Sequence, residues 1–307
     1  MYDLAIIGGG PAGVAAGIYA ARKKIKTILI AETFAGQSAV SPEIQNWIGT
    51  VKISGAELAK NMENHLRAYA TDIVDIRAAQ VESIKNLGTR CLSFEIKTAD
   101  QTYQAKTVLI ATGNRARKLQ ANGAEKFEGK GIAYCVTCDG PLFTDKNVII
   151  VGGGNSAFDG AEQLLSYAKT ITLLHRSETL KADPLIVKKV STLPKIKIIL
   201  NAQITEIKGD DFVKSIIYEN TQTGKKTELP TEGVFVEIGS NPTTEFIKNL
   251  VNLDEFGAII VDAKTQQTSL EGVWAAGDCS DGLYHQNNIA VGDGIKALKN
   301  IYQYLQI

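Results

Sequence analysis

The chain has few cysteines and no long apolar run, and each shortage excludes a class of protein. Its 307 residues include four cysteines, too few for the disulfide framework of a secreted protein of this length. No apolar run approaches the ~18 residues of a membrane-spanning helix. Residues 1–7 lack a basic segment before their apolar run, so no signal peptide is expected. We therefore expect a cytoplasmic protein, without a membrane partner, in which closely spaced thiols are redox-active or bind metal.

Neither sign of charge is in excess, because 33 basic residues balance 33 acidic ones. This balance gives no electrostatic footprint for nucleic acid, so no nucleic-acid partner is expected. Hydrophobic residues make up 44% of the chain and charged residues 21%, as in an ordinary globular protein. At roughly 150 residues per domain, the length predicts two domains.

A glycine-rich turn follows the first apolar strand. Residues 3–7 predict a buried strand, residues 14–22 a helix and residues 25–30 a second strand. Such a turn lets a pyrophosphate reach the free N–H groups at the start of the helix, which carries the positive end of its dipole. The unit predicts a dinucleotide site, and a glycine turn without a ligand is the alternative. The turn residues are Gly8, Gly10, Pro11, Ala12 and Gly13.

Glu32 lies one position beyond the second strand of this unit. An acidic residue about 20 residues after the glycines commonly accepts a ribose hydroxyl. Glu32 is therefore the candidate ribose ligand, with a solvated loop residue as the alternative.

A second glycine-rich turn follows the apolar strand predicted at residues 147–151, and a helix and another strand, 171–174, come next. Two phosphate cradles on one chain predict two dinucleotides, a flavin and a nicotinamide. The turn residues are Gly152, Gly154, Asn155, Ser156 and Ala157.

The residues after strand 171–174 should select the nicotinamide. A base there pairs with the 2′-phosphate of NADP, whereas an acid accepts the 2′-hydroxyl of NAD. His175, Arg176 and Lys181 favour the phosphate, and the acidic Glu178 lies four residues beyond the strand. An exposed charged turn is the alternative.

Two thiols, Cys135 and Cys138, lie between the two glycine turns, with Asp139 beside them. A CxxC pair can provide useful thiolate at neutral pH, and a neighbouring carboxyl can act as general acid. The alternatives are a zinc site and, for Asp139, a simple turn residue. Zinc needs two more ligands, and the other Cys and His residues show no paired metal spacing, so no metal is expected. Cys91 has no partner nearby, which favours a structural role.

The remaining segments give coarser predictions. Residues 53–69 and 291–305 have helical patterns, and residues 114–118 read as a polar linker. Residues 185–240 are expected to form short strands and turns.

These landmarks, taken in order, resemble the bacterial-type low-molecular-weight thioredoxin reductases and the reductase portion of the alkyl hydroperoxide reductase flavoprotein. The resemblance covers essentially the whole chain. It rests on Gly8 to Gly13, Gly36-Gln37, Asn46-Trp47, Ala111-Thr112-Gly113, Cys135 to Gly140, Gly152 to Ala157, Ala275-Ala276-Gly277-Asp278 and Gln286.

The resemblance implies an α/β fold with two Rossmann-like dinucleotide-binding domains and a homodimeric assembly. It implies a discontinuous FAD domain, residues 1–114 and 243–307. The NAD(P)H domain, residues 115–242, is inserted between these segments and carries the CxxC. In the family, this smaller domain rotates so that the dithiol and the nicotinamide take turns at the flavin. FAD would be held by residues including Gly8, Gly10, Gly13, Gly36, Gln37, Asn46, Thr112, Gly113, Gly277, Asp278, His285 and Gln286.

The implied activity is electron transfer from NAD(P)H, through FAD and a Cys135–Cys138 disulfide, to thioredoxin or a thioredoxin-like protein. The resemblance assigns Cys138 as the flavin-side sulfur and Cys135 as the sulfur that attacks the partner. No thioredoxin-like segment precedes Met1, so we expect the electron acceptor to be a separate protein.

Two departures from the family pattern bear on the electron donor. Ser177 and Lys181 replace two arginines of the H-R-R-x-x-x-R motif, and Tyr284-His285-Gln286 replaces Y-R-Q. Because Lys lacks the bidentate fork of Arg, these replacements should reduce the affinity for the 2′-phosphate. NADPH remains the expected donor, NADH is a possible one, and discrimination between them should be weak. The open alternatives are a reductase of a peroxiredoxin-linked carrier, a ferredoxin-fed thioredoxin reductase and a non-enzymatic redox sensor.

Overall fold

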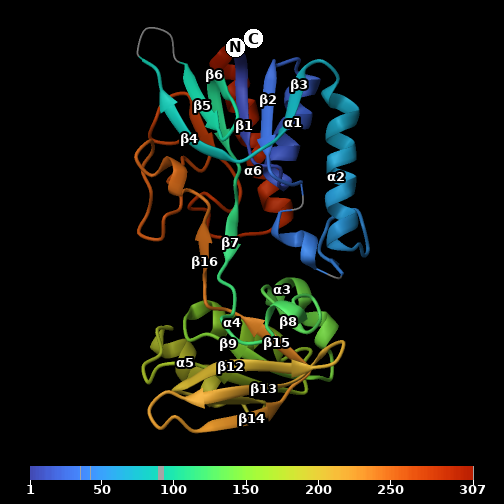
Figure 1. The fold of residues 1–307 in the computed structure, drawn as a ribbon, viewed down its shortest axis with the longest axis vertical. Helices are drawn as coiled ribbons and strands as arrows, with labels where there is room; N and C mark the ends of the chain where they lie inside the picture. Colours follow the sequence, from blue (N-terminus) through green and yellow to red (C-terminus); the bar gives the residue numbers. More distant parts are fainter. Residues whose placement is uncertain (35, 42, 89–92, 307) are drawn as a thin grey trace. The chain divides into compact units, whose positions relative to one another are not determined.

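The computed structural model describes residues 1–34, 36–41, 43–88 and 93–306 (Figure 1). Its internal contacts divide the chain into two compact units, each with its own parallel sheet. Two short paired strands, β7 (Asn114–Ala116) and β16 (Ser240–Pro242), lie where the chain passes from one unit to the other. Unit 1 contains Met1–Ala39, Trp47–Arg115 and Asn241–Ile307, and unit 2 contains Val40–Asn46 and Ala116–Ser240.

The predicted α/β class with two Rossmann-like sheets is confirmed. In unit 1 the strand order is β3-β2-β1-β6-β5-β4, and β17 also pairs with β6. The five parallel strands are β1 (Tyr2–Ile7), β2 (Thr27–Ala31), β3 (Val74–Ala78), β6 (Thr102–Ile110) and β17 (Val273–Ala275). Antiparallel strands β4 (Val81–Asn86) and β5 (Phe94–Thr98) extend one edge.

Helices α1 (Pro11–Arg22), α2 (Gly55–Ala70) and α6 (Asn287–Leu305) share one core with the sheet of unit 1 (Figure 1). Helices α1 and α6 cross closely, because a Cβ on Gly294 would lie 2.2 Å from the carbonyl oxygen of Ala12. Only glycine permits this approach. The crossing fixes the starts of both helices, and the glycine turn of unit 1 adjoins it.

Unit 2 has a five-stranded parallel sheet in the order β11-β10-β9-β15-β8, and all its pairings are parallel. Its strands are β8 (Ile132–Ala133), β9 (Asn147–Val151), β10 (Thr170–Leu174), β11 (Ile196–Ile199) and β15 (Gly233–Val236). An antiparallel sheet follows: β12 (Ala202–Gly209), β13 (Val213–Asn220) and β14 (Lys226–Pro230).

Alternate residues of β9 divide between the two cores of unit 2, as the period of a strand requires. Val148 and Ile150 pack with helices α3 (Val136–Asp139) and α4 (Asn155–Leu164). Ile149, between them, packs with the antiparallel sheet. The parallel sheet is therefore buried on both faces, and the residues at its strand ends carry the site.

One expectation for unit 2 is wrong, because residues 184–191 form helix α5 (Pro184–Ser191) rather than strand or turn. The side chain of Asp183 accepts a hydrogen bond from the N–H of Leu185 at 2.7 Å, and Pro184 occupies the first helical turn. Asp as N-cap and Pro at the first position are helix-start signals. Ile186 and Val187 are β-branched residues, which are enriched in strands, so the sequence pattern favoured a strand here.

The chain passes from one unit to the other within the predicted linker, residues 114–118, and residues 114–116 there form strand β7. Short helical turns complete the chain: Gln37–Val40, Glu125–Phe127, Gly140–Phe143 and Glu245–Ile247. Within the described ranges, none of the helices combines the length and apolar character that a bilayer crossing requires. Cys91, for which a structural role was predicted, lies outside the described residues.

Candidate functional site

The first glycine turn connects β1 to α1 and has the shape of a phosphate cradle. Gly8 has φ +117°, and a Cβ there would lie 2.2 Å from the carbonyl oxygen of Ala111. A Cβ on Gly13 would lie 2.0 Å from the carbonyl oxygen of Gly8, whereas a Cβ on Gly10 would meet no atom within 4 Å. Gly10 caps α1 without a side-chain hydrogen bond, and Pro11 begins the helix. Free N–H groups and open space therefore coincide, as a bound phosphate requires.

Several predicted flavin ligands of unit 1 are brought together through Asn114, which had been predicted to lie in a linker. The side-chain amide of Gln37 donates to Oδ1 of Asn114. Nδ2 of Asn114 lies 3.4 Å from Nδ1 of His285. Asn114 is buried, so three polar side chains from distant segments form one network. Gly36, just before Gln37, lies against α1, because its Cβ would be 3.6 Å from Cδ of Pro11.

Asp278 follows a tight turn at Gly277, which packs against α1 and α6. Gly277 has φ +75°, and its Cβ would lie 3.2 Å from the Cβ atoms of Ala12 and Ala290. Burial raises the pKa of the Asp278 carboxyl, His285 opposes this shift and Asp293 adds to it. Asp278 is thus held beside the N-terminal ends of two helices.

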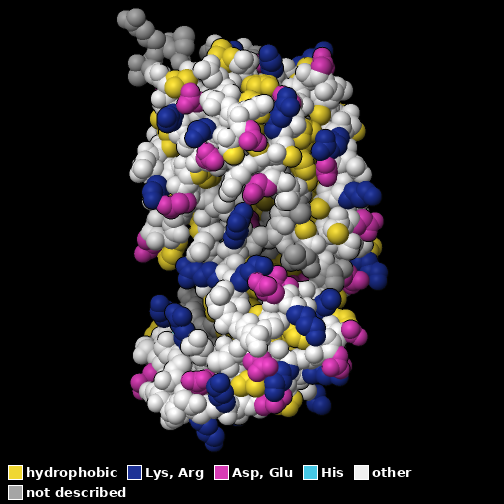
Figure 2. Space-filling model, viewed as in Figure 1, with side chains coloured by type: hydrophobic (Ala, Val, Ile, Leu, Met, Phe, Trp, Pro, Cys, Tyr) yellow, Lys and Arg dark blue, Asp and Glu magenta, His cyan; other side chains and the backbone are white. Residues whose placement is uncertain are grey.

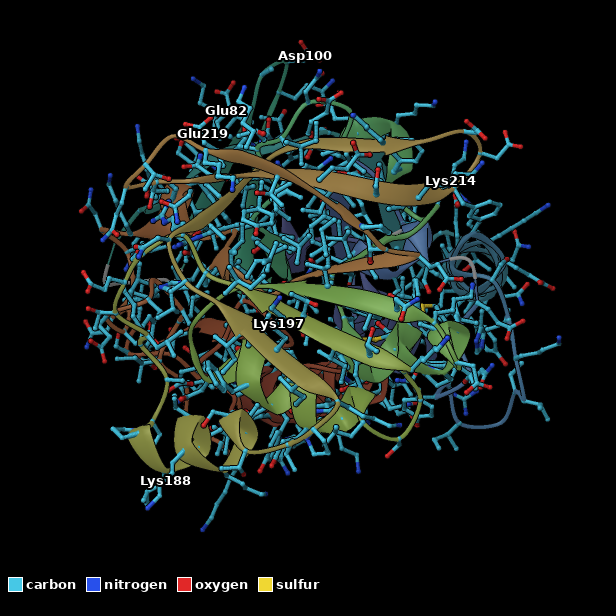
Figure 3. The ribbon with its side chains drawn as sticks, turned by 90° about the horizontal axis from the view of Figure 1, so that it is seen from below. Glu82, Asp100, Lys188, Lys197, Lys214 and Glu219 are labelled. Atoms are coloured by element: carbon cyan, nitrogen blue, oxygen red, sulfur yellow. A yellow bond between two sulfur atoms is a disulfide. The ribbon has the colours of Figure 1, made fainter. Side chains whose placement is uncertain are left out.

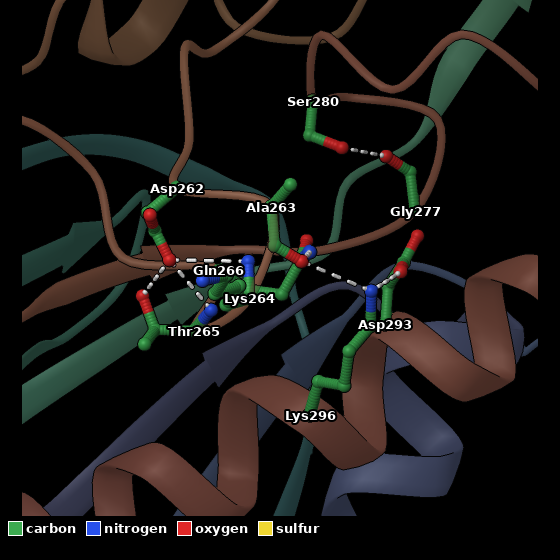
Figure 4. A network of polar contacts seen from close by, with 9 residues as sticks. All are labelled: Asp262, Ala263, Lys264, Thr265, Gln266, Gly277, Ser280, Asp293 and Lys296. Atoms are coloured by element: carbon green, nitrogen blue, oxygen red, sulfur yellow. Dashed lines mark hydrogen bonds and ion pairs between the residues drawn. The ribbon is translucent and has the colours of Figure 1, made fainter.

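Asp293, which adds to the raised pKa of Asp278, is itself paired with a cation (Figure 4). Asp293 forms an ion pair with Lys296 at 2.9 Å, and Lys296 also donates to the carbonyl oxygen of Ala263. Ser280 donates to the carbonyl oxygen of Gly277 at 2.7 Å and closes the turn. The Ser280 contact fixes the turn that carries Asp278, and the Lys296 contacts join α6 to the loop at Ala263.

The other residues predicted for unit 1 lie at the ends of strands or at the start of a helix. Thr112 and Gly113 follow β6, and the Thr112 hydroxyl donates to the carbonyl oxygen of Thr243 at 2.7 Å. Glu32 follows β2, is exposed and lies 3.5 Å from Arg115. Gln286 is the N-cap residue of α6. Asn46 is the exception, because its segment belongs to unit 2.

The second glycine turn connects β9 to α4 and repeats the first geometry. A Cβ on Gly152 would lie 2.3 Å from the carbonyl oxygen of Glu237, whereas Gly154 has open space. Gly154 caps α4 without a side-chain hydrogen bond, so the N–H groups of Asn155, Ser156 and Ala157 begin the helix. Unit 2 thus has its own phosphate cradle.

The charged loop after β10 folds back onto this second cradle. A Cβ on Gly153 would lie 2.3 Å from Nδ1 of His175, so the imidazole covers that glycine. The backbone N–H of Lys181 donates to the carbonyl oxygen of Gly153 at 2.7 Å. The side chain of Asn155 accepts from the N–H of Asp183 at 2.8 Å. Arg176 and Lys181 are exposed on this loop, where a ligand in the cradle would meet them.

The two thiols of unit 2 form a disulfide. Cys135 and Cys138 are joined with their Cα atoms 5.3 Å apart, within the usual range. Cys135 is the N-cap of α3, and its sulfur accepts a hydrogen bond from the N–H of Cys138 at 3.2 Å. A helix N-terminus favours a thiolate at this position, so the pair is suited to redox exchange.

Asp139, at the end of α3, is buried, and burial raises the pKa of its carboxyl. The Ser41 hydroxyl donates to its Oδ1 at 2.9 Å and opposes the shift. A carboxyl with a raised pKa keeps its proton closer to neutral pH, as a general acid must.

A second acid beside α3 had not been predicted from the sequence. Glu237 follows β15, and burial raises the pKa of its carboxyl to about 7, opposed by a hydrogen bond from the backbone N–H of Val136. Gly160 of α4 permits this packing, because its Cβ would lie 3.0 Å from Val136 and 4.0 Å from Cγ of Glu237. The sequence analysis placed this position only within the short strands and turns expected for residues 185–240.

Comparison with known proteins agrees with this geometry. The model of the pyridine nucleotide-disulphide oxidoreductase family matches residues 2–294. The crystal structure of thioredoxin reductase from Streptococcus pyogenes MGAS5005 is 37% identical, with a TM-score of 0.93, over 100% of this chain and 98% of that one.

Two curated relatives are longer than this chain. "NADH dehydrogenase" of Bacillus subtilis (strain 168) is 39% identical over 305 residues, and one of the subunits of alkyl hydroperoxide reductase in Pseudomonas aeruginosa is 39% identical over 307. Each alignment covers 99% of this chain and 58% of the relative, so the chain spans less than two thirds of their length. FAD and NAD(P)H are the cofactors general to the family. The chain therefore belongs to the pyridine nucleotide-disulphide oxidoreductases, in the group that resembles low-molecular-weight thioredoxin reductases, and its redox disulfide is Cys135–Cys138.

Proposed function

We propose that the chain passes electrons from NADPH, through FAD, to the Cys135–Cys138 disulfide and from there to the disulfide of thioredoxin or a thioredoxin-like protein. The observation that carries the proposal is the disulfide at the start of α3, in the unit that also contains a phosphate cradle. A nicotinamide cradle and a reducible disulfide on one unit are the parts that such a transfer requires.

The residues of unit 1 fit FAD. The turn at Gly10 has room for a pyrophosphate against the start of α1. Gln37, His285 and Asp278 supply donors and acceptors around that turn. When bound, FAD accepts hydride from the nicotinamide and supplies two electrons for disulfide reduction. We assign the FAD domain to residues 1–114 and 243–307 and the NAD(P)H domain to residues 115–242, with Val40–Asn46 as a segment of the first that packs with unit 2.

The roles of the thiols and of Asp139 follow from disulfide chemistry. The disulfide takes up two electrons and one proton and gives one thiol and one thiolate. We assign Cys138 as the sulfur that faces the flavin and Cys135 as the sulfur that attacks the partner disulfide. Asp139, buried beside both, donates the proton to the leaving sulfur.

The acceptor and the assembly are part of the same proposal. Relatives of this chain include a thioredoxin reductase and subunits of alkyl hydroperoxide reductase, which suggests a thioredoxin-like acceptor. We propose a cytoplasmic homodimer, whose mass in solution is measurable by light scattering. On the face shown in Figure 2, basic and acidic side chains are interspersed, so this face offers no large patch of one sign to a nucleic acid.

Stopped-flow reduction of the purified yellow protein with NADPH and NADH, side by side, tests the proposal. Rapid bleaching of the flavin by NADPH, followed by turnover of added thioredoxin, is the expected result. Bleaching without reduction of any thioredoxin-like protein would leave an NAD(P)H-dependent flavoprotein with another acceptor. A colourless folded protein would refute the cofactor assignment.

Arg176→Ala should raise the KM for NADPH by about tenfold and leave the KM for NADH nearly unchanged, since an Arg–phosphate contact is charge-assisted. The guanidinium lies on the exposed loop that covers the second cradle. Lys188→Ala is the matched control, because Lys188 is an exposed base on α5 (Figure 3). Equal effects on both nucleotides would show that Arg176 does not read the 2′-phosphate.

A further inference from the structure

Glu237, just after β15, lies against both the glycine turn and helix α3 of unit 2. Its carbonyl oxygen would lie 2.3 Å from a Cβ on Gly152, so its backbone forms one wall of the glycine turn. Its side chain lies between α4, at Gly160, and the first residue of α3, Val136. The assignment of Cys135, Cys138 and Asp139 leaves this carboxyl without a role.

The carboxyl lies close to the thiol that the proposed function assigns to partner attack. It accepts a hydrogen bond from the N–H of Val136, the residue next to Cys135. The Val136 nitrogen is four bonds from the Cys135 sulfur, so carboxyl and sulfur are within about 9 Å of each other. A negative charge at that distance, between two partly buried groups, disfavours a thiolate.

We propose that Glu237 is a positioning residue that sets the reactivity of Cys135: its carboxylate suppresses the Cys135 thiolate, and its protonation releases it. The inference rests on the proposed role of the Cys135–Cys138 pair. A proton taken up by Glu237 when the disulfide is reduced would stabilise the new thiolate, so electron uptake and proton uptake are linked at this residue.

We attribute the proposed effect on the Cys135 thiolate to the Glu237 carboxyl, because the charged groups on the neighbouring elements are hydrogen-bonded, exposed or paired. On α3 the titratable groups are the two thiols, once reduced, and Asp139, which Ser41 holds. On α4 they are Asp159, which is exposed, and Glu162, which pairs with Lys189 at 2.6 Å. Strand β9 and the glycine turn contribute none. Burial and the Val136 N–H are the causes that shift the pKa of Glu237 to about 7.

Glu237→Gln isolates the charge, because the amide oxygen of Gln can still accept from Val136. The reduced protein is alkylated with iodoacetamide between pH 5.5 and 9, and modification of the Cys135 peptide is followed by mass spectrometry. At pH 8 the variant should react about three to ten times faster than wild type, since a carboxylate no longer opposes the thiolate. At pH 5.5 the two rates should agree, because wild-type Glu237 is then protonated.

Glu237→Ala should accelerate the reaction in the same direction, and it provides a second measurement if the Gln variant does not fold. Glu219→Gln is the matched control, because Glu219 is a surface acid on β13 that Figure 3 labels, and it forms only a long ion pair with Lys226, at 3.9 Å. It should react as wild type does at every pH. Superimposable profiles of Glu237→Gln and wild type, or a difference that persists to pH 5.5, would overturn the inference.

The assay uses neither nicotinamide nor a protein acceptor, so it separates this inference from the proposed function. If substitution of Glu237 does not change the pH dependence of Cys135 alkylation, the inference fails and the proposed electron route is unaffected. If thioredoxin reduction persists without Cys135, the electron route fails whatever the alkylation profile shows.

Discussion

Cys135→Ser abolishes reduction of the disulfide substrate and leaves reduction of the flavin by NADPH intact. The loss should exceed about 10⁴-fold, because a serine hydroxyl cannot form the mixed disulfide through which thiol–disulfide exchange proceeds. Serine can still cap α3 and accept from the N–H of Cys138, as the sulfur does. The measurement is steady-state thioredoxin turnover together with stopped-flow flavin reduction.

The free thiol in the described part of the chain provides the control for this substitution. Cys279 is buried beside the carbonyl oxygens of Ile110 and Ala276, and burial raises the pKa of its thiol. Cys279→Ala should keep both activities. Turnover that survives in Cys135→Ser would place the exchange site elsewhere.

Asp139→Asn should slow disulfide exchange by about 10²-fold or more, within the usual range for removal of a general acid. Asn keeps the shape of the side chain and can still accept from the Ser41 hydroxyl, but it has no carboxyl proton to donate. Flavin reduction by NADPH should not change. Single-turnover exchange with reduced enzyme and oxidised thioredoxin measures the step directly.

The pH dependence of the exchange rate distinguishes a general-acid role of Asp139 from a purely structural one. Burial raises the pKa of the Asp139 carboxyl, so its proton is present at acidic pH and is lost as the pH rises through that pKa. The wild-type rate should fall along this titration, and the Asn variant should lack it. Asp211→Asn, in the exposed turn before β13, is the matched control. A rate loss with an unchanged pH profile would mean that Asp139 only shapes α3.

The glycine turns and the CxxC could be predicted from sequence because their signals are local. The glycine spacing of each turn is visible directly after an apolar strand, and a Cβ on Gly13 would lie 2.0 Å from the carbonyl oxygen of Gly8 in the same turn. Two thiols separated by two residues close a disulfide across one helical turn, at a Cα separation of 5.3 Å. These features depend on neighbours within a few residues.

The partners of the site residues could not be predicted, because they are far apart in sequence. Ser41 and Asp139 are separated by 98 positions, and Gln37 and Asn114 by 77. Nothing in the local sequence distinguishes Glu237 from a surface acid, since its shifted pKa comes from burial under α3. Such properties arise only when the sheet and helices pack.

Anaerobic titration with NADPH, followed by a count of accessible thiols, tests the central claim most directly. The wild-type protein should take up about four electrons per chain, two in the flavin and two in the disulfide, and should expose two new thiols. The Cys135→Ser protein should take up about two electrons and should expose no new thiol on reduction. A wild-type chain that stops at two electrons with the Cys135–Cys138 disulfide intact would contradict the proposed route.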